Sequence, residues 1–153
     1  MLKEGAPNGW SWVALTGDSV NVQIEKDGAV RIVIINRPEL RNAVDPDTAT
    51  ELYDAFIEFA EDPDAKVAVL YGAGGSFCSG FDLKALATDA SGWLQQLHFG
   101  EDDRDPPLGP IGPSRLTLAK PVIAGISGAA VASGMELAIW CDLRVMETTA
   151  YMG

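Results

Sequence analysis

The chain has 153 residues, of which 47% are apolar and 22% are charged, and this is enough for one compact domain with a hydrophobic core. Its 22 acidic residues outweigh 11 basic ones, and the resulting formal charge of −11 repels nucleic-acid phosphates and anionic lipid headgroups. We therefore expect no nucleic-acid partner. The two cysteines, Cys78 and Cys141, have no metal-site spacing around them, so we expect a reducing compartment and no metal.

No targeting or membrane segment is readable in the sequence. The first ten residues, MLKEGAPNGW, lack the apolar core of a secretory signal. The longest uncharged stretch, residues 121–135, is shorter than a bilayer crossing and is interrupted by glycine and serine. We therefore expect a cytoplasmic protein that does not interact with membranes.

The first predicted elements are a β-hairpin and a helix. Apolar and polar residues alternate over 20–24, Asp27 and Gly28 favour a turn, and a second apolar run covers 30–35. An aspartate followed by a proline at positions 45 and 46 is typical of a helix start. Apolar residues then recur at helical spacing, which predicts a helix over 46–61 with an acidic outer face.

The rest of the chain completes an α/β pattern. Residues 67–71 form a short apolar run, typical of a strand that a parallel sheet buries on both faces. The later segments predict a glycine-rich loop over 72–80, short helices over 82–87 and 92–99, a polar and mobile connection over 100–113, a strand over 121–126, a helix over 135–141 and a strand over 142–146. The predicted fold class is therefore α/β.

Three common enzyme motifs are absent from the sequence. The loop at 72–77 lacks the last glycine of a dinucleotide-binding turn, and no Gly-Lys-Ser/Thr of a phosphate-binding loop occurs. No serine has the flanking glycines of a hydrolase nucleophile elbow. His98, the sole histidine, lies beside apolar residues, which favours a packing or surface role over a catalytic one.

Two glycine-bearing turns remain, at 78–82 and 132–136, and each leads into a predicted helix. Helix N-termini leave backbone N–H groups unpaired and carry a partial positive charge. If both turns point at one spot, they would stabilise a developing oxyanion there. The spacing leaves a second interpretation open, in which both are tight turns that pack against their neighbours.

Glu136 lies among apolar residues in the first turn of its predicted helix. We expect it to be buried, and carboxylates are seldom buried unless they are paired or functional. A capping role at the positive end of the helix and a general-base role remain alternatives. We expect Cys78 and Cys141 to be packing residues, and Asp142 to accept a hydrogen bond at the end of this helix.

Three linked motifs resemble those of the crotonase (enoyl-CoA hydratase/isomerase) superfamily in order and spacing. They are NRPELRNAV (36–44), FCSGFDLK (77–84), and KPVIA (120–124) followed by SGMELAIWCD (133–142). The resemblance implies a spiral of ββα units over residues 20–153, after an extension over 1–19. It also implies that the chain is the amino-terminal portion of such a protein, because a second catalytic glutamate and the C-terminal helices would follow Gly153.

The resemblance further implies an enzyme that acts on acyl-CoA thioesters, with no cofactor apart from the coenzyme A of its substrate. Glu136 would be an acid/base, and the backbone N–H groups of Phe81 and Ser133 would form the oxyanion hole. The substrate-binding residues it implies are Arg41, Ala43, Phe81, Asp82, Leu83, Lys84, Ser133 and Gly134. The full-length relative would form a homo-oligomer, a trimer or a dimer of trimers. The alternative is a catalytically incomplete fragment that at most binds CoA or associates with other subunits.

Overall fold

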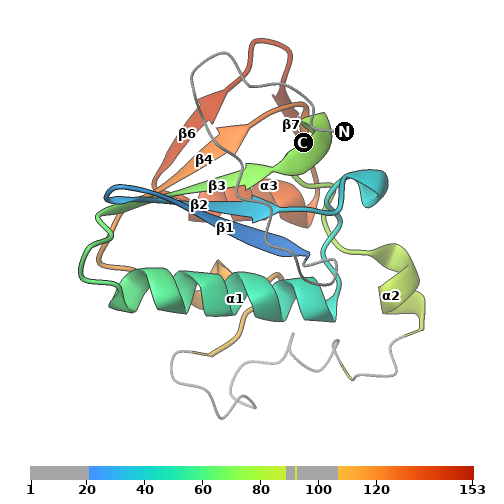
Figure 1. The fold of residues 1–153 in the computed structure, drawn as a ribbon. Coiled ribbons are helices and arrows are strands. Elements are labelled where there is room, and N and C mark those ends of the chain that lie inside the picture. Colours follow the sequence, from blue (N-terminus) through green and yellow to red (C-terminus); the bar gives the residue numbers. More distant parts are fainter. Residues whose placement is uncertain (1–20, 89–91, 93–106) are drawn as a thin grey trace, which may run out of the picture.

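The computed structural model describes residues 21–88, 92 and 107–153. A five-stranded sheet with the order β1-β2-β3-β4-β6 forms its centre, as Figure 1 shows. The strands are β1 (Val22–Asp27), β2 (Val30–Ile35), β3 (Val67–Gly72), β4 (Val122–Ile126) and β6 (Leu143–Met146). The first two strands pair antiparallel and all later pairs are parallel. The predicted α/β fold class is therefore confirmed.

The N-terminal hairpin forms where the sequence predicts it. Asp27 pairs with Val30, and Val22 pairs with Ile35 at the far end of the two strands. Gly28 in the connecting turn has a φ of +54°, a conformation that glycine adopts without steric cost. The hairpin thereby passes the chain to β2, an inner strand of the sheet.

Helix α1 spans Pro46–Glu61, the range that the sequence predicts. Its N-cap is Asp45, whose carboxylate accepts a hydrogen bond from the Thr48 backbone N–H at 2.8 Å. At its other end the Lys120 amine donates to the carbonyl oxygens of Phe59 and Asp62 at 2.9 and 2.6 Å. A lysine that precedes β4 thus caps the C-terminus of the helix and ties it to the sheet.

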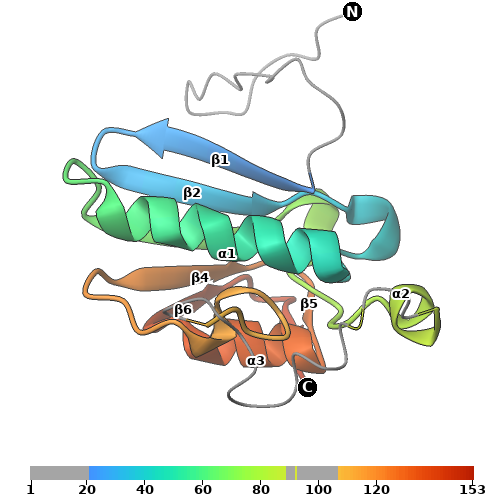
Figure 2. The same cartoon turned by 90° about the horizontal axis from the view of Figure 1, so that it is seen from below.

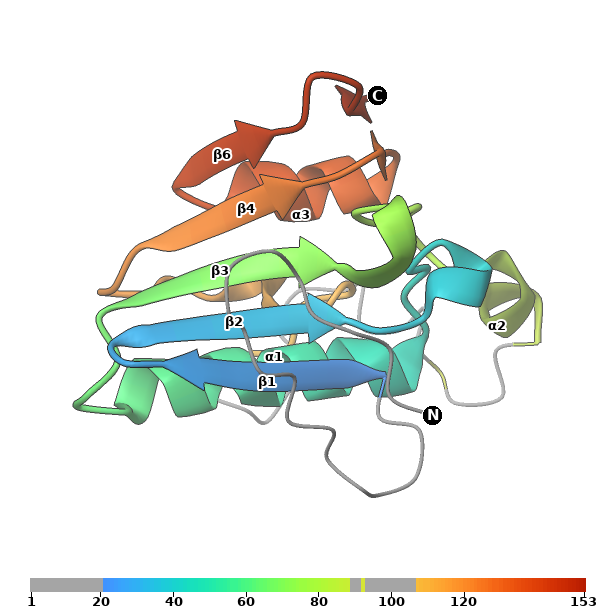
Figure 3. The same cartoon turned by 45° about the horizontal axis from the view of Figure 1, so that its top comes forward.

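The two longer helices cover one face of the sheet. Helix α3 (Ser133–Trp140) lies behind β4 and helix α1 lies behind β1 and β2 in Figure 3, and Figure 2 shows both from the helix side. The predicted helix over 135–141 is confirmed, with a start two residues earlier. A short helix, α2 (Leu83–Ala87), follows the glycine-rich loop, as predicted. A second, two-stranded sheet pairs β5 (Ala129–Ala130) with β7 (Tyr151–Met152).

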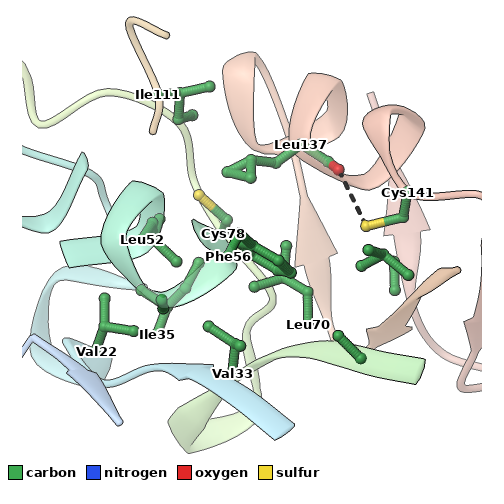
Figure 4. Close-up of a cluster of buried hydrophobic side chains, with 14 of the residues drawn as sticks. Val22, Val33, Ile35, Leu52, Phe56, Leu70, Cys78, Ile111, Leu137 and Cys141 are labelled. Atoms are coloured by element: carbon green, nitrogen blue, oxygen red, sulfur yellow. Dashed lines mark hydrogen bonds between the residues drawn. The ribbon is translucent and has the colours of Figure 1, made fainter. Parts of the chain in front are cut away.

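The core lies between the sheet and these helices. Figure 4 shows side chains that converge there from β1, β2, β3, α1 and α3, with the Cys78 side chain near the centre. Its largest fully buried members include Phe56, Phe59, Phe77, Ile35, Leu52, Leu70, Ile111, Ile126 and Leu137. The aromatic rings of Phe56 and Trp140 meet edge to face with centroids 4.9 Å apart, so α1 and α3 contact each other directly.

One predicted loop needs correction, and two other predicted segments fall largely or wholly outside the described residues. We predict a polar and mobile connection over 100–113, but its described part, residues 107–113, packs into the core because Leu108 and Ile111 are each 2% exposed. A turn between Gly109 and Gly112 points these two apolar side chains inward. The predicted helix over 92–99 with His98, apart from Gly92, and the predicted extension over 1–19 lie outside the described residues.

The described residues hold no group of three or more His, Cys, Asp or Glu side chains that could bind a metal ion. In the same part of the chain, no helix is long and apolar enough to cross a membrane.

Candidate active site

The two glycine turns that the sequence singles out lie against each other. Val131 N–H donates to the Cys78 carbonyl at 3.1 Å, and Cys78 forms a parallel bridge with Ala130. Gly134 packs directly on this loop, because a Cβ placed on it would lie 2.2 Å from the Cys78 carbonyl oxygen. A Cβ on Gly80 would lie 3.2 Å from the Ser133 backbone nitrogen. The backbone clash excludes a side chain at Gly134, and the φ of +94° together with this tight contact favours glycine at position 80.

The turn before α3 has an unusual backbone. Ala132 has φ +50° and ψ −132°, and Gly134 N–H donates to the Val131 carbonyl at 2.9 Å. These angles are those of the first central residue of a type II′ turn, which is normally glycine. The turn places Ser133 at the start of α3, 5% exposed, and its backbone N–H has no acceptor within the described part of the chain. This N–H is thus one of the orphan donors of a helix N-terminus.

The other turn is held from both sides by one residue of the preceding motif. Val44 N–H donates to the Gly80 carbonyl, and Asp82 N–H donates to the Val44 carbonyl, both at 2.8 Å. These two bonds flank Phe81, which is half-buried and packs against the core. Ser79 N–H also donates to the Arg41 carbonyl at 3.1 Å. Residues 41–44 and 79–82 therefore form one continuous backbone platform.

Asp82 joins this platform to α2. One oxygen of its carboxylate accepts hydrogen bonds from the backbone N–H groups of Lys84 and Ala85, which makes Asp82 the N-cap of the helix. The other oxygen lies 3.1 Å from a guanidinium nitrogen of Arg37. Burial acts to raise the pKa of Asp82, but the two N–H groups and Arg37 together hold that pKa below its usual value.

Arg37 and Asn42 are structural residues of the site whose roles the sequence does not reveal. The Asn42 side chain is fully buried, and its amide donates to the carbonyl oxygens of Ala73 and Ser76 at 2.8 and 2.7 Å. Its oxygen accepts from the Arg37 backbone N–H at 2.9 Å. Asn42 thereby holds the glycine-rich loop against the platform. The one available signal is the motif NRPELRNAV itself, which contains both residues without indicating that either is buried.

The remaining predicted site residues are placed as follows. Arg41, Leu83 and Lys84 are exposed around the platform, Ala43 is buried, and Asp82 is half-buried. Leu83 is 74% exposed although it is apolar. The structure therefore brings the predicted substrate-binding residues of the first two motifs together on one side of the molecule, next to the turn that carries Ser133 and Gly134.

The prediction that Glu136 is buried is wrong. The buried face of α3 consists of Ser133, Gly134, Leu137 and Ala138, whereas Glu136 and Ile139 lie three residues apart on its exposed face. Within the described residues the Glu136 carboxylate has neither a hydrogen bond nor an ion pair. The expected place in the first helical turn is confirmed, because Glu136 N–H lies 3.4 Å from the Ala132 carbonyl oxygen.

The two cysteines are packing residues, as expected. Burial raises the pKa of Cys78 to about 11 and that of Cys141 to about 12, so both are neutral thiols at physiological pH. Asp142 accepts a hydrogen bond as predicted, but its donor is the Val122 N–H at the start of β4 and not a helix group.

The architecture and the motifs agree with a known family. The family profile described as enoyl-CoA hydratase/isomerase matches residues 25–153. The chain belongs to this family. The resemblance to the crotonase superfamily is thereby confirmed for most of the chain.

Several proteins are similar to the chain in sequence or structure. (E)-benzylidenesuccinyl-CoA hydratase from Thauera aromatica is 38% identical over 133 residues, which cover 86% of this chain and 49% of that protein. Carnitinyl-CoA dehydratase from Proteus mirabilis is 37% identical over 134 residues, covering 86% and 48%. The crystal structure of enoyl-CoA hydratase EchA1 from Mycobacterium marinum superimposes with a TM-score of 0.75 at 35% identity, covering 87% and 48%. The chain spans about half the length of the curated relatives it matches.

Proposed function

We propose that the chain binds acyl-CoA thioesters and stabilises the enolate oxygen formed from them, as part of an enoyl-CoA hydratase or isomerase. The observation that carries this proposal is the contact between the Gly80–Phe81 turn and the N-terminus of α3. The thioester carbonyl oxygen would be bound by the backbone N–H groups of Phe81 and Ser133. Donors held by a folded backbone stabilise developing negative charge without having to reorganise during the reaction.

The rest of the acyl-CoA molecule would follow the platform. The exposed side chains of Arg41 and Lys84 would meet CoA phosphates, and the segment Asp82–Lys84 with Ala43 would line the pantetheine and adenine. The net charge of −11 opposes a polyanionic ligand over long distances. Local cations that touch phosphate directly are much less affected, because the long-range field is screened within about 8 Å at physiological ionic strength.

Glu136 would act as the acid/base in either reaction. An isomerase removes a proton from one carbon of the acyl chain and returns it to another, for which one base suffices. A hydratase adds the oxygen of water at C3 and a proton at C2, and the family resemblance implies a second glutamate for this. Assembly into trimers and a cytoplasmic location stay predictions.

A second candidate function is binding of CoA thioesters without turnover. The exposure of Glu136 favours it, because burial and charged neighbours tune a general base. In this case the contact between the two turns would serve recognition alone, or association with other subunits would complete the site.

Calorimetric titration of the chain with acetyl-CoA, followed by incubation with crotonyl-CoA, separates the candidates. Stoichiometric binding and hydration or isomerisation that Glu136→Gln reduces at least 100-fold support the enzyme. Binding without turnover supports the second candidate. Absence of binding overturns both.

A further inference from the structure

We propose that Arg37 is a positioning residue of the thioester site, which holds the Phe81 backbone in the geometry needed to bind the acyl carbonyl. This inference rests on the proposed function and deepens it. Arg37 would not touch the substrate, since its guanidinium is surrounded by protein groups that it orders.

Arg37 is a buried cation with three partners. The residue is 9% exposed and follows the last residues of β2. Its guanidinium donates to the Ala43 carbonyl, lies 2.7 Å from a carboxylate oxygen of Asp45, and lies 3.1 Å from one of Asp82. Burial of a charge is tolerated when it is paired in this way. The guanidinium is planar and its donors are fixed, so it also determines where the two carboxylates stand.

Both carboxylates that Arg37 contacts are helix N-caps. Asp45 caps α1 with its second oxygen, and Asp82 caps α2 with its second oxygen. One guanidinium therefore sets the relative position of two helix N-termini. Residue 82 directly follows Phe81, so the same ion pair restricts the backbone on the C-terminal side of the Phe81 peptide.

The remaining support of Phe81 comes from the same unit. Val44 bonds to both neighbours of Phe81, and Val44 itself directly follows Ala43, whose carbonyl accepts from Arg37. Loss of the planar fork at Arg37 would thus loosen both sides of the platform. A shift of a donor by about 1 Å from its productive position costs up to a hundredfold in rate.

The chain offers a matched control in Arg31. Arg31 is 6% exposed and lies on β2, the strand that precedes Arg37. Its guanidinium forms an ion pair of 2.6 Å with Asp62 at the C-terminal end of α1. It also donates to the carbonyl oxygens of Gly28 and Val30. Arg31 and Arg37 therefore have similar burial and pairing, but the partners of Arg31 lie near the hairpin turn and not on the platform.

The test compares affinities for acetyl-CoA and for CoA in the parent chain, Arg37→Lys and Arg31→Lys, at a temperature at which circular dichroism shows each variant folded. Lysine keeps the charge and loses the fork. The expected result is a roughly tenfold loss of acetyl-CoA affinity in Arg37→Lys, with a smaller loss for CoA, because CoA has no acyl carbonyl for the Phe81 N–H. Arg31→Lys should leave both affinities within about twofold of the parent.

A second variant keeps the proposal testable if Arg37→Lys does not fold. Asp82→Asn retains an N-cap for α2 but removes the charge that pairs with Arg37, and we expect a severalfold loss of acetyl-CoA affinity. Equal effects of Arg37→Lys and Arg31→Lys, or unchanged binding in Asp82→Asn, would overturn the role of Arg37. A parent chain that binds neither ligand overturns the proposed function itself, so the two failures are distinguishable.

Discussion

The turn at Gly80 and the carboxylate at Glu136 are built into the fold in opposite ways. The turn is surrounded by buried polar groups, since Arg37, Asn42 and Val44 each bond to it or to the loop before it. Glu136 lies on the outer face of α3, in the same C-terminal region as β6, whose four residues are all exposed. The described chain thus holds the Gly80 turn through several hydrogen bonds but gives the Glu136 carboxylate no hydrogen bond or ion pair.

This difference separates two kinds of effect. Substitutions around Gly80 should change both the free energy of unfolding and the binding of acyl-CoA. Glu136→Gln should leave the free energy of unfolding within about 0.5 kcal/mol of the parent, because surface substitutions without partners rarely do more. Variants around the Gly80 turn test this difference, from the largest expected effect to the smallest.

Gly134→Ala should have the largest effect, because it separates the two turns. The added Cβ would lie 2.2 Å from the Cys78 carbonyl oxygen and 2.7 Å from its carbon, and neither backbone atom can move without shifting the loop. We expect a loss of about 3 kcal/mol in the free energy of unfolding, measured in urea, and loss of acetyl-CoA binding. Gly125→Ala in β4 is the control, since its Cβ would meet no atom closer than 3.5 Å and stability should stay within about 0.5 kcal/mol. Equal stability of the two variants would contradict the close contact.

Asn42→Ala should follow, with a loss of about 3 kcal/mol. The substitution leaves the Ala73 and Ser76 carbonyls without their buried donor and the Arg37 N–H without its acceptor. It also places alanine at a φ of +56°, which asparagine tolerates better. Urea unfolding measures the change.

The control for Asn42→Ala is Ser79→Ala. The Ser79 hydroxyl also joins the two motifs, by a 3.3 Å hydrogen bond to the Leu40 carbonyl, but this bond is exposed to solvent. We expect less than about 0.5 kcal/mol from its removal. If both variants lose the same stability, burial does not make the hydrogen bonds of the Asn42 amide to Ala73 and Ser76 stronger than the exposed bond of Ser79.

The sequence predicts the regular elements of this region well. Helix α1 is confirmed from its first residue to its last, because the cap at Asp45 and the helical spacing are local signals. The apolar runs likewise place β2, β3 and β4 within one residue of their ends, whereas β1 begins two residues and ends three residues later than the alternating run over 20–24. The interpretation that both glycine segments are turns before helices is also confirmed.

Long-range contacts explain what the sequence does not predict. The burial of Arg37 depends on two aspartates, one of them 45 positions along the chain. The prediction of a polar connection over 100–113 rests on the acidic residues at 101–105 and the prolines after them, which hide the two apolar residues that the turn at 109–112 buries. Glu136 has apolar neighbours in sequence, but the helical period of 3.6 residues puts it with Ile139 on the exposed face.

Ala132→Gly should stabilise the chain. Alanine at φ +50° and ψ −132° is strained by roughly 1–3 kcal/mol, and glycine removes this strain at a smaller entropic cost. We expect a net gain of about 1 kcal/mol in the free energy of unfolding. Ala87→Gly at the exposed end of α2, where the backbone is helical, is the control and should cost about 0.5–1 kcal/mol. A loss of stability in Ala132→Gly would show that the turn has ordinary backbone angles in solution.

The smallest expected effect is the pH dependence that Asp82 contributes. Because Arg37 and the two backbone N–H groups hold its pKa in the folded chain below the usual 3.8, the unfolded chain takes up the proton first as the pH falls. The stabilisation is therefore fully present above pH 4 to 5 and is lost as the pH falls through the lower, folded pKa. Asp82→Asn should reduce the drop in unfolding free energy between pH 6 and pH 2.5 by about 0.5 kcal/mol.

The acid dependence of Asp82→Asn should be shallower but not flat. Arg31 lowers the pKa of Asp62 as well. Asp62 therefore still makes the free energy of unfolding fall with pH when Asp82 is replaced. Asp62→Asn is the matched variant, and it should remove its own share while leaving acetyl-CoA affinity unchanged at pH 7. A parent and an Asp82→Asn variant with the same acid profile would mean that neither the Ala85 and Lys84 N–H groups nor Arg37 lower the pKa of Asp82 in solution. The Gly80 turn would then be supported by Asn42 and by the backbone hydrogen bonds of Val44, Ser79 and Val131, without a contribution from Arg37.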